Sequence, residues 1–180
     1  MRTKNSIFIA TSLDGFIADQ NGNIDWLHQI PNPDGDDMGY RAFMGEIDAL
    51  LMGRNTYETV LSFDMDWPYD QPVFVLSTTL NSVPKELEGK VFLKKGDLSV
   101  ILSEIKEAGY HHLYIDGGKT IQRFLEQDLI DEMIITSIPI LLGGGTPLFG
   151  SNDKRLAFTC TNTKRFVNAV AQNHYTRNRD

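Results

Sequence analysis

The sequence has a single cysteine, Cys160, and no apolar run long enough to cross a membrane. One cysteine cannot close an internal disulfide or supply a cysteine-based zinc site, which fits a reducing cytoplasm. The apolar run within residues 6–18 is interrupted by Asp14 and Asp19, and no export-type charged start and cleavage site frame it. A membrane helix needs about 20 apolar residues. We therefore expect a cytoplasmic protein without a membrane partner.

Positive charge is also scarce, because 17 Lys and Arg stand against 24 Asp and Glu and give a formal net charge of −7 at pH 7. This balance repels nucleic acid at long range, although a local cationic spot can still bind a phosphate. The four histidines, His28, His111, His112 and His174, show no metal-ligand or triad spacing, so we predict no metal site. Repeats and linkers are missing as well. Residues 1–180 are thus expected to form one domain.

Short apolar strands alternate with helical patterns along most of the chain. Strands are predicted at residues 5–12, 49–52, 73–76, 90–93, 112–115 and 132–140, and helices at 36–47, 54–62, 98–108 and 118–127. Residues 13–35 have the composition of a loop, at a length typical of functional loops. Two further strands, 156–161 and 167–175, flank a turn predicted at 162–165. This order predicts an α/β fold with a mainly parallel central sheet and a C-terminal antiparallel hairpin.

A glycine pair stands at one strand-to-helix junction, in Asp116-Gly117-Gly118-Lys119-Thr120. Paired glycines let backbone N–H groups approach a phosphate, and the start of a helix adds partial positive charge. The segment is neither a Walker loop nor the six-residue dinucleotide fingerprint. It therefore predicts either a phosphate-binding turn or an ordinary tight turn.

Three other strand ends carry hydroxyl or cationic side chains. Met52-Gly53-Arg54-Asn55-Thr56 is a second strand-to-helix junction, Ser77-Thr78 ends the next strand, and Lys94-Lys95 ends the one after. In a parallel sheet such ends line one edge, which is where open α/β sheets bind ligands. Each cluster alone is typical of a solvated loop. Together they favour a site for a ligand with several phosphates.

Three weaker candidates lie elsewhere. The triple glycine at residues 143–145 follows a predicted strand and suits either a close approach to a flat ligand or a flexible connection. Asp14, in Ser12-Leu13-Asp14-Gly15, is typical of a turn. Asp37, in the first turn of the helix predicted at 36–47, is either a stabilising helix-start charge or a functional acid.

These motifs together resemble the dihydrofolate reductase superfamily, and more closely the branch that contains the C-terminal reductase domain of the bacterial riboflavin biosynthesis protein. The similar segments are Ser12-Leu13-Asp14-Gly15-Phe16-Ile17-Ala18, Met52-Gly53-Arg54-Asn55-Thr56-Tyr57-Glu58, Asp116-Gly117-Gly118, and the branch-specific Ile138-Pro139-Ile140-Leu141-Leu142-Gly143-Gly144-Gly145-Thr146-Pro147-Leu148-Phe149. The resemblance spans roughly residues 5–175. It implies a dihydrofolate-reductase-like three-layer fold, with helices on both faces of the sheet.

The resemblance also implies an NADPH-dependent reductase and assigns residues to its site. The cofactor would be bound by Gly53, Arg54, Thr56, Ser77, Thr78, Gly117, Gly118, Lys119 and Thr120, with Ala10 and Ile17 beside its nicotinamide. Asp37, supported by Thr136, would hold the substrate and serve catalysis. Arg41, Gly143 and Gly144 complete the expected substrate contacts.

Two departures from dihydrofolate reductase bear on the substrate. Trp26 stands farther from Asp37, with a Pro- and Gly-rich insertion between them. Arg41 occupies the position four residues beyond Asp37, where a dihydrofolate reductase would place an aromatic residue. A cation there favours a phosphorylated substrate, such as a phosphoribosylamino-pyrimidine, whereas the alternative for Arg41 is a solvated helix face. The zinc deaminase pattern of the bifunctional riboflavin proteins is missing, so we expect only the reduction.

The predicted function is hydride transfer from NADPH to a pyrimidine- or pteridine-like substrate, as in a 5-amino-6-(5-phosphoribosylamino)uracil reductase. Asp37 or an ordered water is the available proton donor. A homodimer is expected because the branch is commonly dimeric and cyclic dimers are the commonest assemblies. Two alternatives remain, a non-catalytic NADP-binding sensor and a divergent dihydrofolate reductase. Arg41 and the triple glycine disfavour the second.

Overall fold

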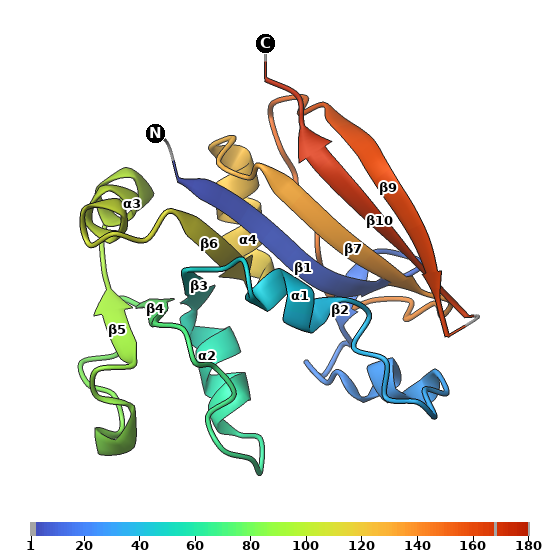
Figure 1. The fold of residues 1–180 in the computed structure, drawn as a ribbon, viewed down its shortest axis with the longest axis horizontal. Helices are drawn as coiled ribbons and strands as arrows, with labels where there is room; N and C mark the ends of the chain where they lie inside the picture. The colour runs from blue at the N-terminus through green and yellow to red at the C-terminus, as the bar shows by residue number, and fades with distance from the viewer. Residues whose placement is uncertain (1–2, 168, 180) are drawn as a thin grey trace.

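The computed structural model describes residues 3–167 and 169–179. Its centre is an eight-stranded sheet in the order β5-β4-β3-β6-β1-β7-β10-β9 (Figure 1). The strands are β1 (Lys4–Ser12), β3 (Ala49–Gly53), β4 (Val73–Leu76), β5 (Val91–Lys94), β6 (His112–Asp116), β7 (Glu132–Ile138), β9 (Phe158–Phe166) and β10 (Val170–Arg177). The strands from β5 to β7 in this order pair in parallel, whereas β10 pairs antiparallel with β7 and with β9. The predicted sheet is confirmed.

Helices cover both faces of the sheet. Successive residues of a strand point to opposite faces, so neighbours on β3 pack against different helices. Leu51 belongs to the core cluster that contains α3 (Leu98–Glu107) and α4 (Gly118–Glu126). Its neighbour Leu50 belongs to a second cluster, with Phe43 of α1 (Tyr40–Met44) and Tyr57 of α2 (Arg54–Leu61). The three-layer arrangement is therefore confirmed. No helix in the described part of the chain is long and apolar enough to cross a membrane.

The helix predicted at residues 36–47 is shorter than expected and begins at Tyr40. Asp37 lies in the turn before it, where its carboxylate accepts the N–H groups of Gly39 at 2.9 Å and Arg41 at 3.0 Å. Met38 and Gly39 have φ values of 54° and 88°. A right-handed α-helix cannot include residues with positive φ, so the helix begins after them. The prediction that Asp37 stands in the first helical turn is therefore wrong.

The loop predicted at residues 13–35 contains two short elements. β2 (Phe16–Ala18) pairs antiparallel with β8 (Thr146–Pro147), which directly follows the triple glycine. The 3₁₀ helix η1 (Asp25–Gln29) buries Trp26 against Ile138 and Val170. A further 3₁₀ helix, η2, covers Lys85–Leu87. The pairing of β2 with β8 joins segments far apart in the chain, so no local pattern predicts it.

The turn predicted at residues 162–165 is wrong, because β9 continues to Phe166 and β10 begins at Val170. Asn168, within the predicted strand 167–175, lies outside the described residues. The polar composition of 162–165 favours a turn locally, but pairing with β10 extends the strand. Polar residues are tolerated there because β9 is the outermost strand and is exposed between its two ends (Figure 1).

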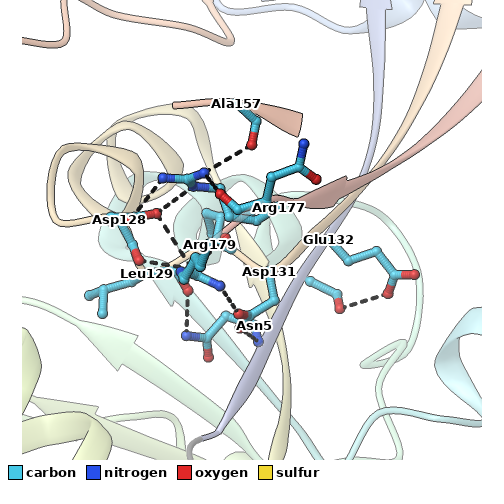
Figure 2. A network of polar contacts seen from close by, with 11 residues as sticks. Asn5, Asp128, Leu129, Asp131, Glu132, Ala157, Arg177 and Arg179 are labelled. Atoms are coloured by element: carbon cyan, nitrogen blue, oxygen red, sulfur yellow. Dashed lines mark hydrogen bonds and ion pairs between the residues drawn. The ribbon is translucent and has the colours of Figure 1, made fainter. Parts of the chain in front are cut away.

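A group of paired charges lies at the amino end of the parallel strands (Figure 2). Arg177 donates two hydrogen bonds to Asp128, at 2.7 and 3.0 Å, and Arg179 pairs with Asp131. Asp131 also accepts the backbone N–H of Asn5 at 2.8 Å. This amino-edge network of Asn5, Asp128, Asp131, Arg177 and Arg179 ties the end of β10 to the start of β1 and to the loop between α4 and β7.

Candidate functional site

The carboxyl ends of β5, β4, β3 and β6 meet at one edge of the sheet. Register pairs Lys94 with Leu76 and Leu76 with Gly53, while Met52 pairs with Asp116. The residues that follow these strands therefore lie side by side. This confirms the prediction that the polar strand ends gather at a single edge.

A hollow of about 320 Å³ opens at this edge. Hydroxyl-bearing and cationic side chains from four elements line most of it: Arg54, Leu76, Ser77, Thr78, Thr79, Lys94, Lys95, Gly96 and Arg123. Arg54 Nη1 donates to Thr79 Oγ1 at 2.9 Å, and the Thr79 N–H donates to Ser77 Oγ at 3.1 Å. These bonds hold the guanidinium beside the hydroxyls that follow β4. We call this feature the cationic hollow.

Carboxylates only partly neutralise the cationic hollow. Arg54 lies 3.7 Å from Glu58, and Lys94 lies 2.6 Å from Glu104. Within residues 3–167 and 169–179, Lys95 and Arg123 have no carboxylate partner. Clustered cations in a protein with a net charge of −7 produce a local positive potential, which attracts an anionic ligand.

The two strand-to-helix turns beside the hollow interlock. Gly117 has a φ of 91°, and a Cβ on it would stand 2.3 Å from Thr56 Oγ1. A Cβ on Gly53 would stand 2.8 Å from Thr120 Oγ1. Glycine is therefore required by contacts within the protein, whatever the turns bind. The predicted contacts of Gly53, Thr56, Gly117 and Thr120 with a cofactor stay predictions.

Gly118 begins α4 and contacts the small β2–β8 sheet. A Cβ there would lie 3.0 Å from both Ile17 Cδ1 and Thr146 Cγ2. Ile17 is thus placed next to the turn that contains Lys119, which is exposed at the start of the helix. Ala10 lies on β1 opposite Thr136 and packs against the cluster formed by Trp26.

Asp116, at the end of β6, is an ionisable group that its sequence motif indicates only as part of a turn. Burial raises the pKa of its carboxyl to about 6, although the Gly117 N–H donates to it at 2.8 Å and acts in the opposite direction. Burial, followed by the charge of Asp116, raises the pKa of Tyr40 to about 12 and also raises that of Tyr69. A carboxyl with a pKa near 6 can give up a proton close to neutral pH. The sequence feature that could have indicated Asp116 as a functional acid is its position at the end of a buried strand.

Thr136 is linked to the turn of Asp37 through a residue that the sequence did not indicate. Gln172 Nε2 donates to Thr136 Oγ1 and to the carbonyl of Met38, both at 3.0 Å. The Arg41 and Gly39 N–H groups lower the pKa of Asp37. Asp37 is therefore ionised near neutral pH, which suits a group that accepts hydrogen bonds and not one that delivers a proton.

The other predicted substrate contacts have partners within the protein. The Arg41 side chain is 94% exposed, and its Nε lies 3.8 Å from Asp37. The Gly143 N–H donates to Asp14 at 2.8 Å, and a Cβ on Gly144 would stand 2.8 Å from Gln20. Contact of these residues with a substrate stays a prediction. Among the described residues, no group of three His, Cys, Asp or Glu could hold a metal ion.

A family model described as the RibD C-terminal domain matches residues 5–171. The chain belongs to the RibD C-terminal domain family. The uncharacterised protein YwjB of Bacillus subtilis strain 168 is 36% identical over 179 residues, which cover 98% of this chain and 99% of YwjB.

Several solved structures have a similar fold. A putative riboflavin biosynthesis protein from Shewanella sp. PV-4 has a TM-score of 0.95 and 54% identity, covering 98% of this chain and 99% of that one. The Thermotoga maritima diaminohydroxyphosphoribosylaminopyrimidine deaminase/5-amino-6-(5-phosphoribosylamino)uracil reductase has a TM-score of 0.74 at 20% identity, covering 98% of this chain but 57% of that one. Dihydrofolate reductase from Enterococcus faecalis has a TM-score of 0.66 at 16% identity, covering 98% and 97%. The dihydrofolate-reductase-like fold is confirmed.

Proposed function

We propose that this chain is an NADPH-dependent reductase that transfers a hydride to a phosphoribosylamino-pyrimidine or a related pteridine-like substrate. The observation that carries the proposal is the cationic hollow at the carboxyl edge of the sheet. Membership of the RibD C-terminal domain family supports a reductase of the riboflavin pathway. The activity for which the Thermotoga maritima protein is named supports the choice of a pyrimidine substrate.

The cationic hollow fits the phosphate end of NADPH. Arg54, Ser77 and Thr78 would hold the 2′-phosphate, because charge-assisted bonds to a phosphate are the strong ones. The start of α4, from Gly118 to Thr120, would hold the pyrophosphate with the N–H groups of its first turn and its partial positive charge. When bound, NADPH supplies the hydride.

The substrate needs a carboxylate to orient it and a proton to complete the reduction. Asp37, ionised near neutral pH, would accept N–H bonds from an amidine-like ring edge, while Gln172 and Thr136 hold its turn in place. Asp116 would deliver the proton, because its pKa of about 6 leaves part of the population protonated near neutral pH. The hydride joins the carbon of a C=N or C=O bond, and the proton joins its nitrogen or oxygen.

NADPH oxidation tests the proposal. The purified protein is mixed with NADPH and with 5-amino-6-(5-phosphoribosylamino)uracil, dihydrofolate or dihydrobiopterin, and absorbance at the NADPH band is followed. Consumption with the pyrimidine, at a rate well above that with the two pterins, supports the proposal. Tight NADPH binding without consumption on any of the three would contradict it and favour the non-catalytic sensor. Fast consumption with dihydrofolate alone would identify a divergent dihydrofolate reductase.

We also propose a cytoplasmic homodimer, in which β9 is the outer edge available for a second copy. β9 is the last strand of the sheet, and its residues between Phe158 and Phe166 are exposed. A long exposed edge strand presents unpaired backbone groups, which a second chain can pair with. Light scattering at micromolar concentration should give twice the chain mass of 20.3 kDa. A mass equal to that of one chain would refute the dimer.

A further inference from the structure

Asp14 stands in an exposed turn after β1, yet its carboxylate binds backbone groups 128 and 129 residues away. Its Oδ1 accepts the N–H of Leu142 at 3.1 Å, and its Oδ2 accepts the N–H of Gly143 at 2.8 Å. Ser12 Oγ donates to Oδ1 at 2.6 Å and accepts the Phe16 N–H at 3.0 Å. An aspartate that served only the local turn would bond nearby backbone alone. Asp14 instead joins the end of β1 and the start of β2 to the segment of residues 141–145.

The segment that Asp14 holds runs directly against the candidate site. A Cβ on Gly145 would stand 2.1 Å from the carbonyl oxygen of Ala18, so the segment lies tightly on β2. Thr146, the next residue, packs against Gly118 at the start of α4. The held segment therefore lies on β2, which we expect to border the ring of the cofactor, and it leads directly into Thr146, which contacts the start of α4.

We infer that Asp14 is a positioning residue, which fixes residues 141–145 beside the ring end of the bound cofactor and thereby sets the approach of the substrate. This inference rests on the proposed function. Three successive glycines give residues 143–145 little conformational stiffness of their own. Two hydrogen bonds to a carboxylate supply that stiffness, because bonds to an ionised acceptor are shorter and stronger than neutral ones.

The Ser12 hydroxyl, with the N–H groups of Gly143 and Leu142, holds the pKa of Asp14 below its usual value. The carboxylate is therefore ionised throughout the pH range in which a reductase assay is run. Asp14→Asn keeps the size of the side chain, but it turns one of the two acceptor oxygens into a donor that faces an N–H group. The substitution should release one or both bonds to the segment while leaving the backbone bond from the Leu13 N–H to the Ile140 carbonyl, at 2.8 Å, in place.

Asp19→Asn provides the matched control. Asp19 is also an aspartate in a turn of the same loop, and its Oδ1 accepts two backbone N–H groups, from Asn21 and Asn23, both at 2.8 Å. The Asp19 backbone packs against Gly145, but its carboxylate bonds only nearby residues, so Asp19→Asn leaves the bonds of Asp14 to Leu142 and Gly143 in place. Any effect common to both variants reports the loss of a turn, and an effect confined to Asp14→Asn reports the long-range contact.

Two measurements test the inference on the parent and both variants. The first is amide hydrogen exchange of residues 141–145, with and without NADPH. We expect exchange in Asp14→Asn to be about tenfold faster, as for a lost bond of about 1.4 kcal/mol, with little added protection by NADPH. The second is steady-state reduction of 5-amino-6-(5-phosphoribosylamino)uracil. A group displaced by about 1 Å can lower the rate about a hundredfold, so we expect such a fall in kcat with a change of less than about threefold in the Kd for NADPH.

The outcomes separate this inference from the proposed function. Unchanged exchange in Asp14→Asn, or equal changes in both variants, would overturn the inference. Faster exchange with a parental kcat would overturn it as well, because the contact would then be structural only. If the parent reduces none of the substrates, the proposed function fails. The inference is then decided by exchange alone, since NADPH should protect residues 141–145 in the parent and in Asp19→Asn but not in Asp14→Asn.

Discussion

The two ends of the central sheet both carry clustered charges, but they differ in how completely these charges are paired. At the amino end, Arg177 and Arg179 meet Asp128 and Asp131, and Lys4 lies 2.8 Å from Glu132. At the carboxyl end, the cationic hollow gathers arginine and lysine around open space, and carboxylates neutralise them only in part. The amino end also has a hollow, of about 330 Å³, but Lys4, Asp131 and Glu132 in its lining are paired with opposite charges, and this pairing serves folding. Incomplete pairing at the carboxyl end leaves charge for a ligand.

This difference separates two kinds of charged side chain in the protein. A charged side chain with a complete set of internal partners can be removed only at a cost in stability, because its partner then loses the bonds that offset burial. A charged side chain that faces a hollow can be removed with little loss of stability but with loss of binding. Substitutions at the two ends should therefore affect different quantities.

The largest effect is expected for Asp116→Asn at the carboxyl end. Loss of the proposed proton donor should lower kcat/KM by about 10²–10⁴-fold, while the Kd for NADPH stays near the parental value. The parental kcat/KM should fall as pH rises above about 6, because the protonated carboxyl is then depleted. Initial rates between pH 5 and 8 test both points, with Asp64→Asn, in the exposed loop after α2, as control. A parental pH profile in Asp116→Asn would remove Asp116 from the mechanism.

Stability provides a second readout for the same variant. The pKa of Asp116 is raised from 3.8 to about 6, so the fold favours the protonated carboxyl. The contribution to stability is full at low pH and is lost as pH rises through about 6. At pH 8 the ionised group therefore costs up to about 3 kcal/mol, which Asp116→Asn should recover. Urea unfolding at pH 8 that shows a less stable variant would contradict the assigned burial.

The next largest effect is expected at the amino end, for Arg177→Met. Its side chain is 10% exposed, donates two bonds to Asp128 and lies over the ring of Phe158. Removal of the guanidinium should lower the free energy of unfolding by about 2–3 kcal/mol, since hydrogen bonds to charged groups contribute about that much. The Kd for NADPH should change less than about twofold. Arg155→Met, at an exposed position, controls for the loss of charge. Weaker NADPH binding in Arg177→Met would contradict the claim that charges at the amino end affect stability alone.

Arg54→Ala should show the reverse pattern. Loss of one charge-assisted bond of about 1.5–3 kcal/mol weakens NADPH binding by roughly ten- to a hundredfold. NADH lacks the 2′-phosphate, so its affinity should stay unchanged, as should the melting temperature. Fluorescence titration of both cofactors checks this, with Lys106→Ala on the exposed side of α3 as control. An equal loss of affinity for both cofactors would place Arg54 elsewhere on the ligand.

The smallest effect is expected for Lys4→Met. The Lys4 and Glu132 side chains are 45% and 26% exposed, so solvent screens the pair. Such pairs contribute about 0.2–1 kcal/mol, and the effect should shrink in 1 M salt. Urea unfolding at two salt concentrations measures it. A loss above about 2 kcal/mol would show that Lys4 acts as part of the amino-edge network.

Sequence patterns predicted the sheet and the gathering of polar strand ends well, because both follow from local features. A short apolar strand before a helix has a clear pattern, and parallel strands necessarily bring their carboxyl ends to one edge. The sequence alone thus predicts that Arg54, Ser77, Thr78 and Lys94 lie together. The family resemblance added the expectation that the ligand is NADPH, which spacing alone does not contain.

The remaining features depend on contacts between distant residues. The start of α1 is set by the left-handed turn at Met38 and Gly39, whereas composition favoured an earlier start. The hairpin turn lies later in the chain than predicted, because pairing with β10 extends β9 through the polar residues 162–165. Gln172 reaches Thr136 from a strand 36 residues away, and Asp14 reaches Gly143 across 129 residues. No pattern along a single sequence carries such pairings.

Cofactor selectivity of the parental protein tests the central claim most directly. NADPH and NADH are titrated at the same ionic strength, and their Kd values are compared at low and at high salt. If the cationic hollow holds the 2′-phosphate, NADPH should bind at least about tenfold more tightly, and high salt should narrow the gap. Equal affinities for the two cofactors at low salt would contradict the assignment of the carboxyl edge as a phosphate site.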